Sequence, residues 1–162
     1  MAWTDPVAWA RMLAGSDCIM CADIHLEANA FSFLVAELRQ SYVRLGRNQY
    51  RRGNTVVALK RHANELFELS DDELADYWRD VADAAAAIQR VFAPVKINYA
   101  ILGNLCPHIH CHLLPQFATD DPPRLLDMGD GQLLLTDQEY EQVVADLRRE
   151  LVFTANATTP NH

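Results

Sequence analysis

The pattern of apolar and polar positions predicts a set of short strands in this 162-residue chain. Runs rich in β-branched, aromatic and apolar residues are typical of strands. Such runs occupy residues 31–35, 42–45, 55–60, 96–102 and 107–115. Gly103 and Asn104 form a turn signal before the last run, so the last two strands are expected to pair antiparallel.

Capping signals and three- to four-residue apolar spacing predict three helices. The first is expected over 3–14, with Asp5 as its cap and Pro6 in its first turn. A capping box at 70–73 begins a helix that runs to about Phe92, and another at 136–139 begins a helix that runs to about Leu151. The apolar stripe of the long helix comprises Leu74, Trp78, Val81, Ala85, Ile88 and Phe92.

These elements predict an α+β fold, because the strands form a continuous antiparallel set into which helices are inserted. Residues 1–153 are expected to form a single domain that includes the N-terminal and C-terminal helices. Residues 22–30, of mixed composition, and 118–132, rich in Asp, Pro and Gly, are expected to be loops. Residues 154–162 lack apolar side chains for a core and are expected to form a flexible tail.

Charge and composition narrow the classes of partner. Fourteen basic and 22 acidic residues give a net charge of −8, which disfavours polymeric nucleic acid but allows a small anionic ligand. No apolar run approaches the roughly 18 residues of a membrane span, and the N-terminus lacks the pattern of a signal peptide. We therefore expect a cytoplasmic protein whose four cysteines are reduced thiols or metal ligands.

Three histidines alternate with apolar residues between Pro107 and Pro115, which are expected to bracket a strand. Alternate strand side chains share a face, so His108, His110 and His112 are expected to line a pocket while the intervening residues pack on the core. Catalysis and metal ligation both suit three imidazoles in register. A structural role is the third possibility, although burying unpartnered imidazoles is costly.

Residues 98–115 resemble the signature of the histidine triad (HIT) superfamily, in which an Asn, a Gly-Asn pair and three alternating histidines recur. The likeness extends over about residues 17–118, including a strand–turn–strand segment from Asn48 to His62. It implies a five-stranded antiparallel sheet with a long helix and flanking helices, and a homodimer. It also implies hydrolysis or transfer at the α-phosphate of a nucleotide conjugate, such as a dinucleoside polyphosphate or a nucleoside phosphoramidate.

The resemblance assigns roles to individual residues. His110 would be the nucleophile, forming a nucleotidyl-histidine that water then hydrolyses, with no cofactor required. The backbone carbonyl of His108 would hold the far ring nitrogen of His110 protonated, so that the near nitrogen can attack. His112 would hydrogen-bond phosphate oxygens and assist the leaving group. The implied substrate-binding residues are Asn98, Gly103, Asn104 and Asn48.

The sequence departs from the family pattern at four positions. Asn54 stands where a histidine is common in the upstream turn, and Gly46 where an Asp or Asn often binds the ribose. Leu105 replaces a Ser or Thr near the phosphate, and Gln116 replaces an Arg after the final proline. These departures leave open a catalytically weak, nucleotide-binding regulatory relative.

The resemblance also implies a structural zinc site made of Cys18, Cys21, His62 and His108, because some members of the superfamily bind zinc at these positions. Two thiolates and two imidazoles suit tetrahedral zinc. Alternatively, the two cysteines are small buried apolar groups. A third hypothesis is a metalloenzyme in which all three triad histidines hold one zinc. The remaining cysteines, at 106 and 111, are most simply core or pocket-wall residues.

A cluster of basic residues falls within 18 residues that contain no acid. It comprises Arg44, Arg47, Arg51, Arg52, Lys60 and Arg61. One interpretation is electrostatic steering of a polyphosphate toward the pocket. The other is a solvated hairpin surface or the rim of a dimer interface.

Overall fold

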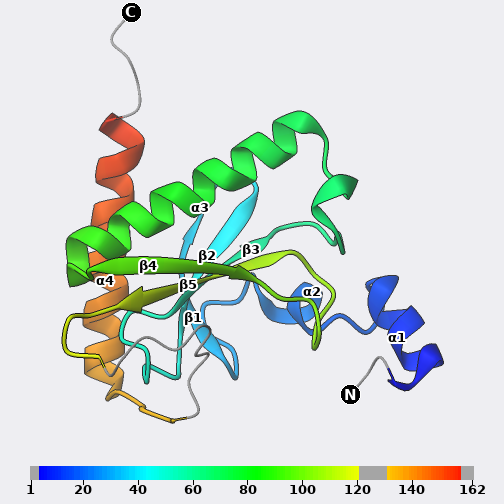
Figure 1. Ribbon diagram of the computed structural model, residues 1–162, viewed down its shortest axis with the longest axis horizontal. Helices are drawn as coiled ribbons and strands as arrows, with labels where there is room; N and C mark the ends of the chain where they lie inside the picture. Colours follow the sequence, from blue (N-terminus) through cyan, green and yellow to red (C-terminus); the bar gives the residue numbers. More distant parts are fainter. Residues whose placement is uncertain (1–3, 121–130, 158–162) are drawn as a thin grey trace, which may run out of the picture.

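The computed structural model describes residues 4–120 and 131–157, with the backbone alone over 152–157. Its centre is one sheet with the strand order β1-β2-β3-β5-β4 (Figure 1). The strands are β1 (Ser32–Glu37), β2 (Ser41–Gly46), β3 (Thr55–Leu59), β4 (Lys96–Ile101) and β5 (His110–Gln116). The predicted five-stranded antiparallel α+β fold is confirmed, including the antiparallel pairing of β4 with β5.

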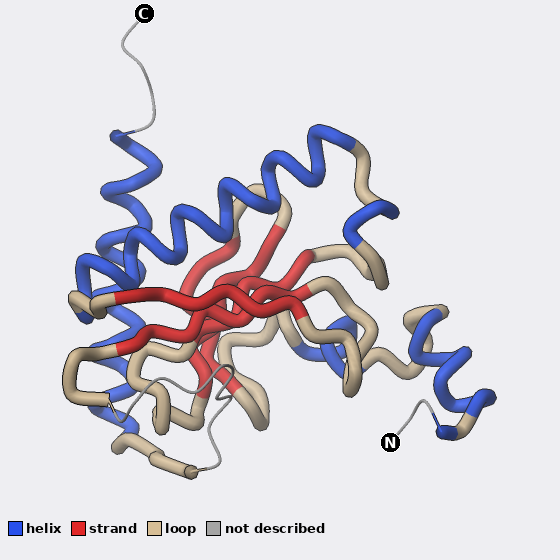
Figure 2. The backbone as a smooth tube through the Cα atoms, viewed as in Figure 1, coloured by secondary structure: helices blue, strands red, loops and turns tan. Residues whose placement is uncertain are grey.

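Figure 2 shows how the helices surround the sheet. They are α1 (Pro6–Leu13), α2 (Ile19–Asp23), α3 (Asp71–Phe92) and α4 (Asp137–Ala157), with a short 3-10 turn at Leu66–Glu68. Both predicted capping boxes are present, one between Ser70 and Glu73 and the other between Thr136 and Glu139. Within the described ranges, no helix combines the length and the apolar character that crossing a bilayer requires.

Two sequence predictions about segment boundaries are wrong. Residues 19–23 form α2, so the loop predicted for 22–30 begins only after Asp23; a five-residue helix is too short to produce an apolar period. The last helix continues past Leu151, so 154–157 are helical rather than part of a tail. Leu151 is a core residue, and extending an established helix beyond it adds one hydrogen bond per residue. Predictions for 121–130 and 158–162 lie outside the described residues.

The limits of β5 also differ from prediction, because neither proline brackets the strand. Before His110 the backbone leaves the ladder: the N–H of His108 donates to the carbonyl of Cys106, and that of Ile109 donates to the carbonyl of Ala63. Pro115 lies inside β5 and pairs with β4. The ladder with β3 ends at Leu113, so β5 has a partner on only one side at Pro115, where sheets tolerate proline.

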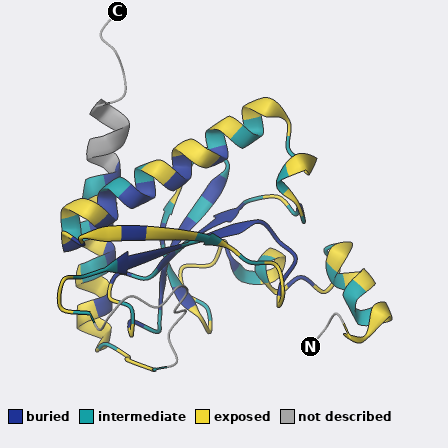
Figure 3. Cartoon of the chain, in the orientation of Figure 1, coloured by how far each residue is buried: buried dark blue, intermediate teal, exposed yellow. Residues whose placement is uncertain are grey.

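The helices α3 and α4 pack against one face of the sheet and enclose the hydrophobic core. Figure 3 shows the buried side of α3 turned toward the strands. The buried stripe of α3 runs through Tyr77, Val81, Ala84 and Ile88, and the Tyr77 hydroxyl donates to a backbone carbonyl of β3. Trp78, predicted for this stripe, is 40% exposed, because its position lies about 100° around the helix from Tyr77.

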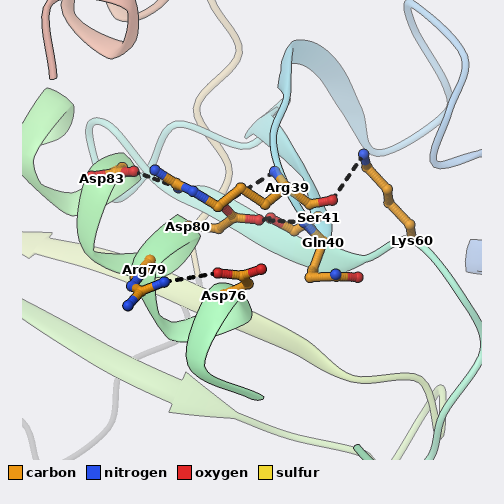
Figure 4. Close-up of polar contacts among 8 residues, drawn as sticks. All are labelled: Arg39, Gln40, Ser41, Lys60, Asp76, Arg79, Asp80 and Asp83. Atoms are coloured by element: carbon orange, nitrogen blue, oxygen red, sulfur yellow. Dashed lines mark hydrogen bonds and ion pairs between the residues drawn. The ribbon is translucent and has the colours of Figure 1, made fainter. Parts of the chain in front are cut away.

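A buried carboxylate joins α3 to the turn between β1 and β2 (Figure 4). The Asp80 side chain is fully buried and accepts hydrogen bonds from the backbone N–H groups of Arg39 and Gln40 and from the hydroxyl of Ser41. Its Oδ1 also lies 3.0 Å from the guanidinium of Arg39. Four donors to one carboxylate offset the desolvation cost of burying its charge, and they hold the β1–β2 hairpin against α3.

Replacing Asp80 by Asn should lower the free energy of unfolding by about 2–4 kcal/mol, because an amide NH₂ would face donors that require an acceptor. Urea denaturation measures this loss. The control is Asp76→Asn, one turn earlier, where the carboxylate makes an i,i+3 pair with the largely exposed Arg79. That change should cost less than about 1 kcal/mol. Equal losses of unfolding free energy for the two variants would contradict the proposal that Asp80 stabilises the contact between α3 and the β1–β2 hairpin.

Candidate active site and metal centre

The alternation predicted for the histidine run is present. Ile109, Cys111 and Leu113 belong to the hydrophobic core, and none of them is more than 2% exposed. Successive side chains of a strand point to opposite faces, so His110 and His112 point away from that core. The sheet thus has a core face under α3 and α4 and an opposite face that carries the two histidines.

Small side chains flank these two histidines on the neighbouring strands. His110 lies opposite Ala58 of β3, and His112 lies opposite Val56 of β3 and Ala100 of β4. The centroids of the two imidazole rings are 4.9 Å apart, and the rings meet edge to face. None of the paired residues has a long side chain that could cover the rings from the adjacent strands.

A hydrogen bond fixes the tautomer of His110. Its Nδ1 lies 2.6 Å from the backbone carbonyl oxygen of His108. A carbonyl oxygen can only accept, so Nδ1 carries the hydrogen and Nε2 carries the lone pair. This is the contact that the resemblance implies.

Burial favours the neutral form of the imidazoles. Desolvation lowers the pKa of His110 below its ordinary value, and it lowers the pKa of His112 to about 4, with a further contribution from His110. Neutral His110 therefore presents a nucleophilic Nε2 at neutral pH. The Nδ1 atom of His112 is buried and makes no hydrogen bond to any residue that the structure describes.

Four potential metal ligands meet where the N-terminal segment contacts the sheet. One donor atom from each of Cys18, Cys21, His62 and His108 lies within 4.8 Å of the other three. The Nδ1 of His62 is 3.3 Å from the Cys21 sulfur, and the Nδ1 of His108 is 3.5 Å from both cysteine sulfurs. The structure therefore brings together all four residues that the sequence suggested for zinc.

Backbone carbonyls orient both imidazoles of this cluster. The Nε2 of His62 donates to the carbonyl of Leu13 at 3.0 Å, and the Nε2 of His108 donates to the carbonyl of Leu59 at 2.7 Å. Each ring thus keeps its Nδ1 lone pair for the cluster, an orientation commonly found behind metal-bound histidines. Two thiols and two such imidazoles fit tetrahedral zinc, so the cluster is compatible with a structural zinc ion.

The N-terminal segment meets the sheet at this cluster. The helix α1 contributes no buried residue, and Figure 3 shows it apart from the buried strands. At Gly15, which has a φ of +82°, a Cβ would lie 3.2 Å from the His62 ring. The positive φ and this tight approach to His62 both favour glycine at position 15.

The geometry does not support one metal held by all three triad histidines. Among the described residues, the group of potential ligands contains His108 but neither His110 nor His112. His108 precedes β5, and its ring turns toward the cysteines. The Nδ1 of His110 is engaged with a carbonyl oxygen. The three rings therefore belong to two adjoining sites, and the prediction that all three line one pocket is wrong, because His108 precedes the strand and its ring faces the cysteines.

The predicted substrate-binding residues divide into two groups. Asn98 is exposed on β4 and lies opposite Leu114, one step along the histidine face from His112. Gly103 and Asn104 are exposed in the loop that leads from β4 to the histidines. These three residues lie beside the triad in strand register or in sequence.

Asn48 differs, because its amide is engaged in loop contacts. Its nitrogen donates to the carbonyl of Gly131, and its oxygen accepts from the backbone N–H groups of Tyr50 and Leu133. None of its described contacts is with a triad histidine. In the described structure, Asn48 therefore connects two loops and does not contact the histidines.

The basic cluster is not a uniform solvated surface, because Arg44 is only 2% exposed. Arg44 lies in the same cross-strand row as His112, and desolvation lowers its pKa. Its guanidinium donates to Ser32 and to the carbonyls of Ile24 and Leu26. These bonds hold the loop between α2 and β1 on the histidine face. The sequence signal for this role was an arginine at an alternating position of a strand.

Comparison with known proteins identifies relatives with this architecture. The HIT domain matches residues 27–119. An uncharacterised HIT-like protein of Methanocaldococcus jannaschii is 27% identical over 107 residues, which is 64% of this chain and 81% of that protein. A hypothetical histidine triad nucleotide-binding protein of Sulfolobus tokodaii has a similar structure, with a TM-score of 0.69 and 19% identity, covering 89% of this chain and 98% of the other.

A zinc-bound histidine triad family protein of Mycobacterium smegmatis is also similar, with a TM-score of 0.60 and 23% identity, covering 87% of this chain and 97% of the other. The segment matched by the HIT domain contains every strand of the sheet and all three alternating histidines. Because that segment makes up more than half of the sequence, this chain belongs to the HIT domain family.

Proposed function

We propose that this protein is a nucleotide hydrolase or nucleotidyl transferase that acts at the α-phosphate of a nucleotide conjugate through His110. The observation that carries the proposal is the 2.6 Å hydrogen bond between His110 Nδ1 and the His108 carbonyl, which leaves Nε2 as a neutral nucleophile. Membership of the HIT domain family supports a function of this nucleotide-binding or hydrolytic type.

The proposed reaction has two steps. In the first, the Nε2 lone pair of His110 forms a bond to the α-phosphorus, and the bond from phosphorus to the leaving group breaks, with its electron pair going to the leaving group. In the second, water attacks the nucleotidyl-histidine; the P–N bond breaks and the nucleoside monophosphate leaves. A transferase would use another acceptor in place of water. This chemistry requires no cofactor.

Neighbouring residues would bind and position the phosphate. The His112 ring, which is half-buried beside His110, would hydrogen-bond a phosphate oxygen. Asn98 and Asn104 offer neutral donors that hold phosphate oxygens without competing for the His110 lone pair. The substrate class that suits this site is a dinucleoside polyphosphate or a nucleoside phosphoramidate.

A second candidate is a nucleotide-binding regulatory protein with weak catalysis. Leu105 stands where the HIT-family pattern has a Ser or Thr. Its side chain is 73% exposed and offers no hydrogen bond to a phosphate. Loss of one such donor weakens transition-state stabilisation more than ground-state binding when the charge develops in the reaction. Binding without turnover is the signature of this candidate.

We also propose that the Cys18, Cys21, His62 and His108 cluster binds structural zinc. The orientation of both imidazoles by backbone carbonyls supports it, as does the likeness to a zinc-bound family protein. All four cysteines are free thiols. Free thiols and zinc thiolates are suited to a reducing compartment, so we place the protein in the cytoplasm.

The sheet edge at β4 supports a homodimer as the assembly. β4 is an edge strand, and Val95, Tyr99 and Ile101 beside it are 69%, 50% and 38% exposed. A groove of about 380 Å³ runs between this strand and the alanines at 82, 85 and 86 of α3. An unpaired apolar edge is a site for strand pairing, so we propose that β4 pairs with β4 of a second copy.

The nucleophile is tested by replacing His110 with Ala. Turnover of nucleotide conjugates should fall by at least about 10³-fold, because covalent catalysis is lost. A quenched reaction of the unchanged protein should show a nucleotidyl adduct on His110 by mass spectrometry. The control is His25→Ala, because His25 is exposed and lies outside the triad. Full turnover by the His110 variant would exclude this mechanism, and tight binding without turnover or adduct would favour the regulatory candidate.

The zinc proposal is tested by Cys21→Ser, which should lower bound zinc in elemental analysis. Loss of zinc should also speed tryptic cleavage at Arg11, because α1 buries no residue of its own. The matched variant Cys111→Ala lies in the core and should keep its zinc. Unchanged zinc in the Cys21 variant would show that this cluster is not the site.

The dimer proposal is tested by Ala82→Arg, which places a charge in the groove beside β4 without burying it. Size-exclusion chromatography with light scattering should show a dimer for the unchanged protein and a monomer for this variant. The control is Ala145→Arg on the exposed face of α4, which should remain dimeric. A dimer in both variants would place the interface elsewhere.

A further inference from the structure

A third thiol lies beside the proposed metal ligands. Cys106 is in the loop between β4 and β5, and its sulfur is 3.6 Å from the sulfur of Cys18. Both side chains are buried, at 4% and 3% exposure. The sequence predicts only a core or pocket-wall position for Cys106, and the contact joins residues 88 positions apart in the chain.

The cluster does not need Cys106 to complete a tetrahedral site. Cys18, Cys21, His62 and His108 already supply four donor atoms, and zinc in structural sites takes four. Cys106 lies outside that group but contacts one of its thiols. By contrast, the Cys111 sulfur is in the core, and the contact described for it is with the carbonyl of His112.

We propose that Cys18 and Cys106 form a redox pair, which a hydroperoxide oxidises to a disulfide that removes Cys18 from the metal site. In the first step, the sulfur of one residue attacks a peroxide oxygen; the O–O bond breaks, giving a sulfenic acid and water. In the second step, the other sulfur attacks the sulfenic sulfur, forming the S–S bond and releasing water. Two thiols lose two electrons, and one hydrogen peroxide is reduced to two waters.

The geometry suits this reaction. A disulfide has an S–S length of about 2.05 Å, so the two sulfurs must approach by about 1.5 Å. Cys106 lies in a loop and Cys18 precedes the short α2, so neither is inside a long regular element. Cys21, which belongs to the same cluster, is exposed, so the cluster reaches solvent at this thiol.

Oxidation would couple the metal cluster to the histidine site. Cys18 would no longer be a ligand, and the His108 ring would lose one of its two neighbouring thiols. The carbonyl of the same His108 residue holds His110. This consequence rests on the zinc and catalytic proposals, whereas formation of the disulfide does not.

The experiment treats the zinc-loaded full chain with hydrogen peroxide. Zinc release is followed with a chromogenic chelator, and non-reducing peptide mapping identifies the linkage. We expect a Cys18–Cys106 disulfide, a mass loss of two hydrogens, and recovery on adding dithiothreitol. In Cys106→Ser, zinc release should be several-fold slower. The control Cys111→Ala should behave like the unchanged protein.

Three outcomes would overturn the proposal: a Cys18–Cys21 linkage alone, equal release rates with and without Cys106, or absence of zinc from untreated Cys106→Ser, which would make Cys106 a ligand. Mapping is repeated on metal-free protein, so the disulfide is tested even if the zinc proposal fails. Neither readout uses a nucleotide. A failure of the proposed nucleotide chemistry would therefore not affect the test of the disulfide.

Discussion

One hydrogen bond, from His110 Nδ1 to the backbone carbonyl of His108, fixes the orientation of the candidate nucleophile. It sets the tautomer of His110, because the carbonyl can only accept. The His108 ring is held separately by the carbonyl of Leu59 and faces the thiols of Cys18 and Cys21. His108 therefore contributes its main chain to one candidate site and its side chain to the other.

The sheet makes this arrangement possible because its two faces are covered differently. The core face is sealed by α3 and α4, whose apolar stripes bury the alternate residues of β5. The histidine face is contacted by the N-terminal segment mainly through polar groups. Arg44 holds the loop after α2 by hydrogen bonds to carbonyls, and His62 donates to the end of α1. A ligand or a metal ion on that face can therefore affect the N-terminal segment without disturbing the core.

Sequence reasoning succeeded where the signal is local. The strand alternation of β5, the capping box at Ser70 and the antiparallel β4–β5 pair depend on neighbours within a few residues. It failed for the choice of which side chains of a helix are buried, because that choice depends on packing. Trp78 lies at the spacing of an apolar stripe, yet the stripe that meets the sheet passes through Tyr77. The sequence pattern defines a helical face only to within about one residue of rotation, and the contact with the sheet selects which residue is buried.

By itself, the sequence determined the α+β class and the alternating histidines, because period, caps and residue type are properties of short segments, whereas the set of four metal-ligand candidates came from the resemblance to the HIT superfamily. Only the tertiary structure decided that Asn48 joins two loops, that Arg44 is buried, and that Cys106 touches Cys18 across 88 positions of sequence. Each of these contacts joins segments that are distant in the chain. Their meeting depends on how the loops cross the sheet, which no local pattern of apolar and polar residues specifies.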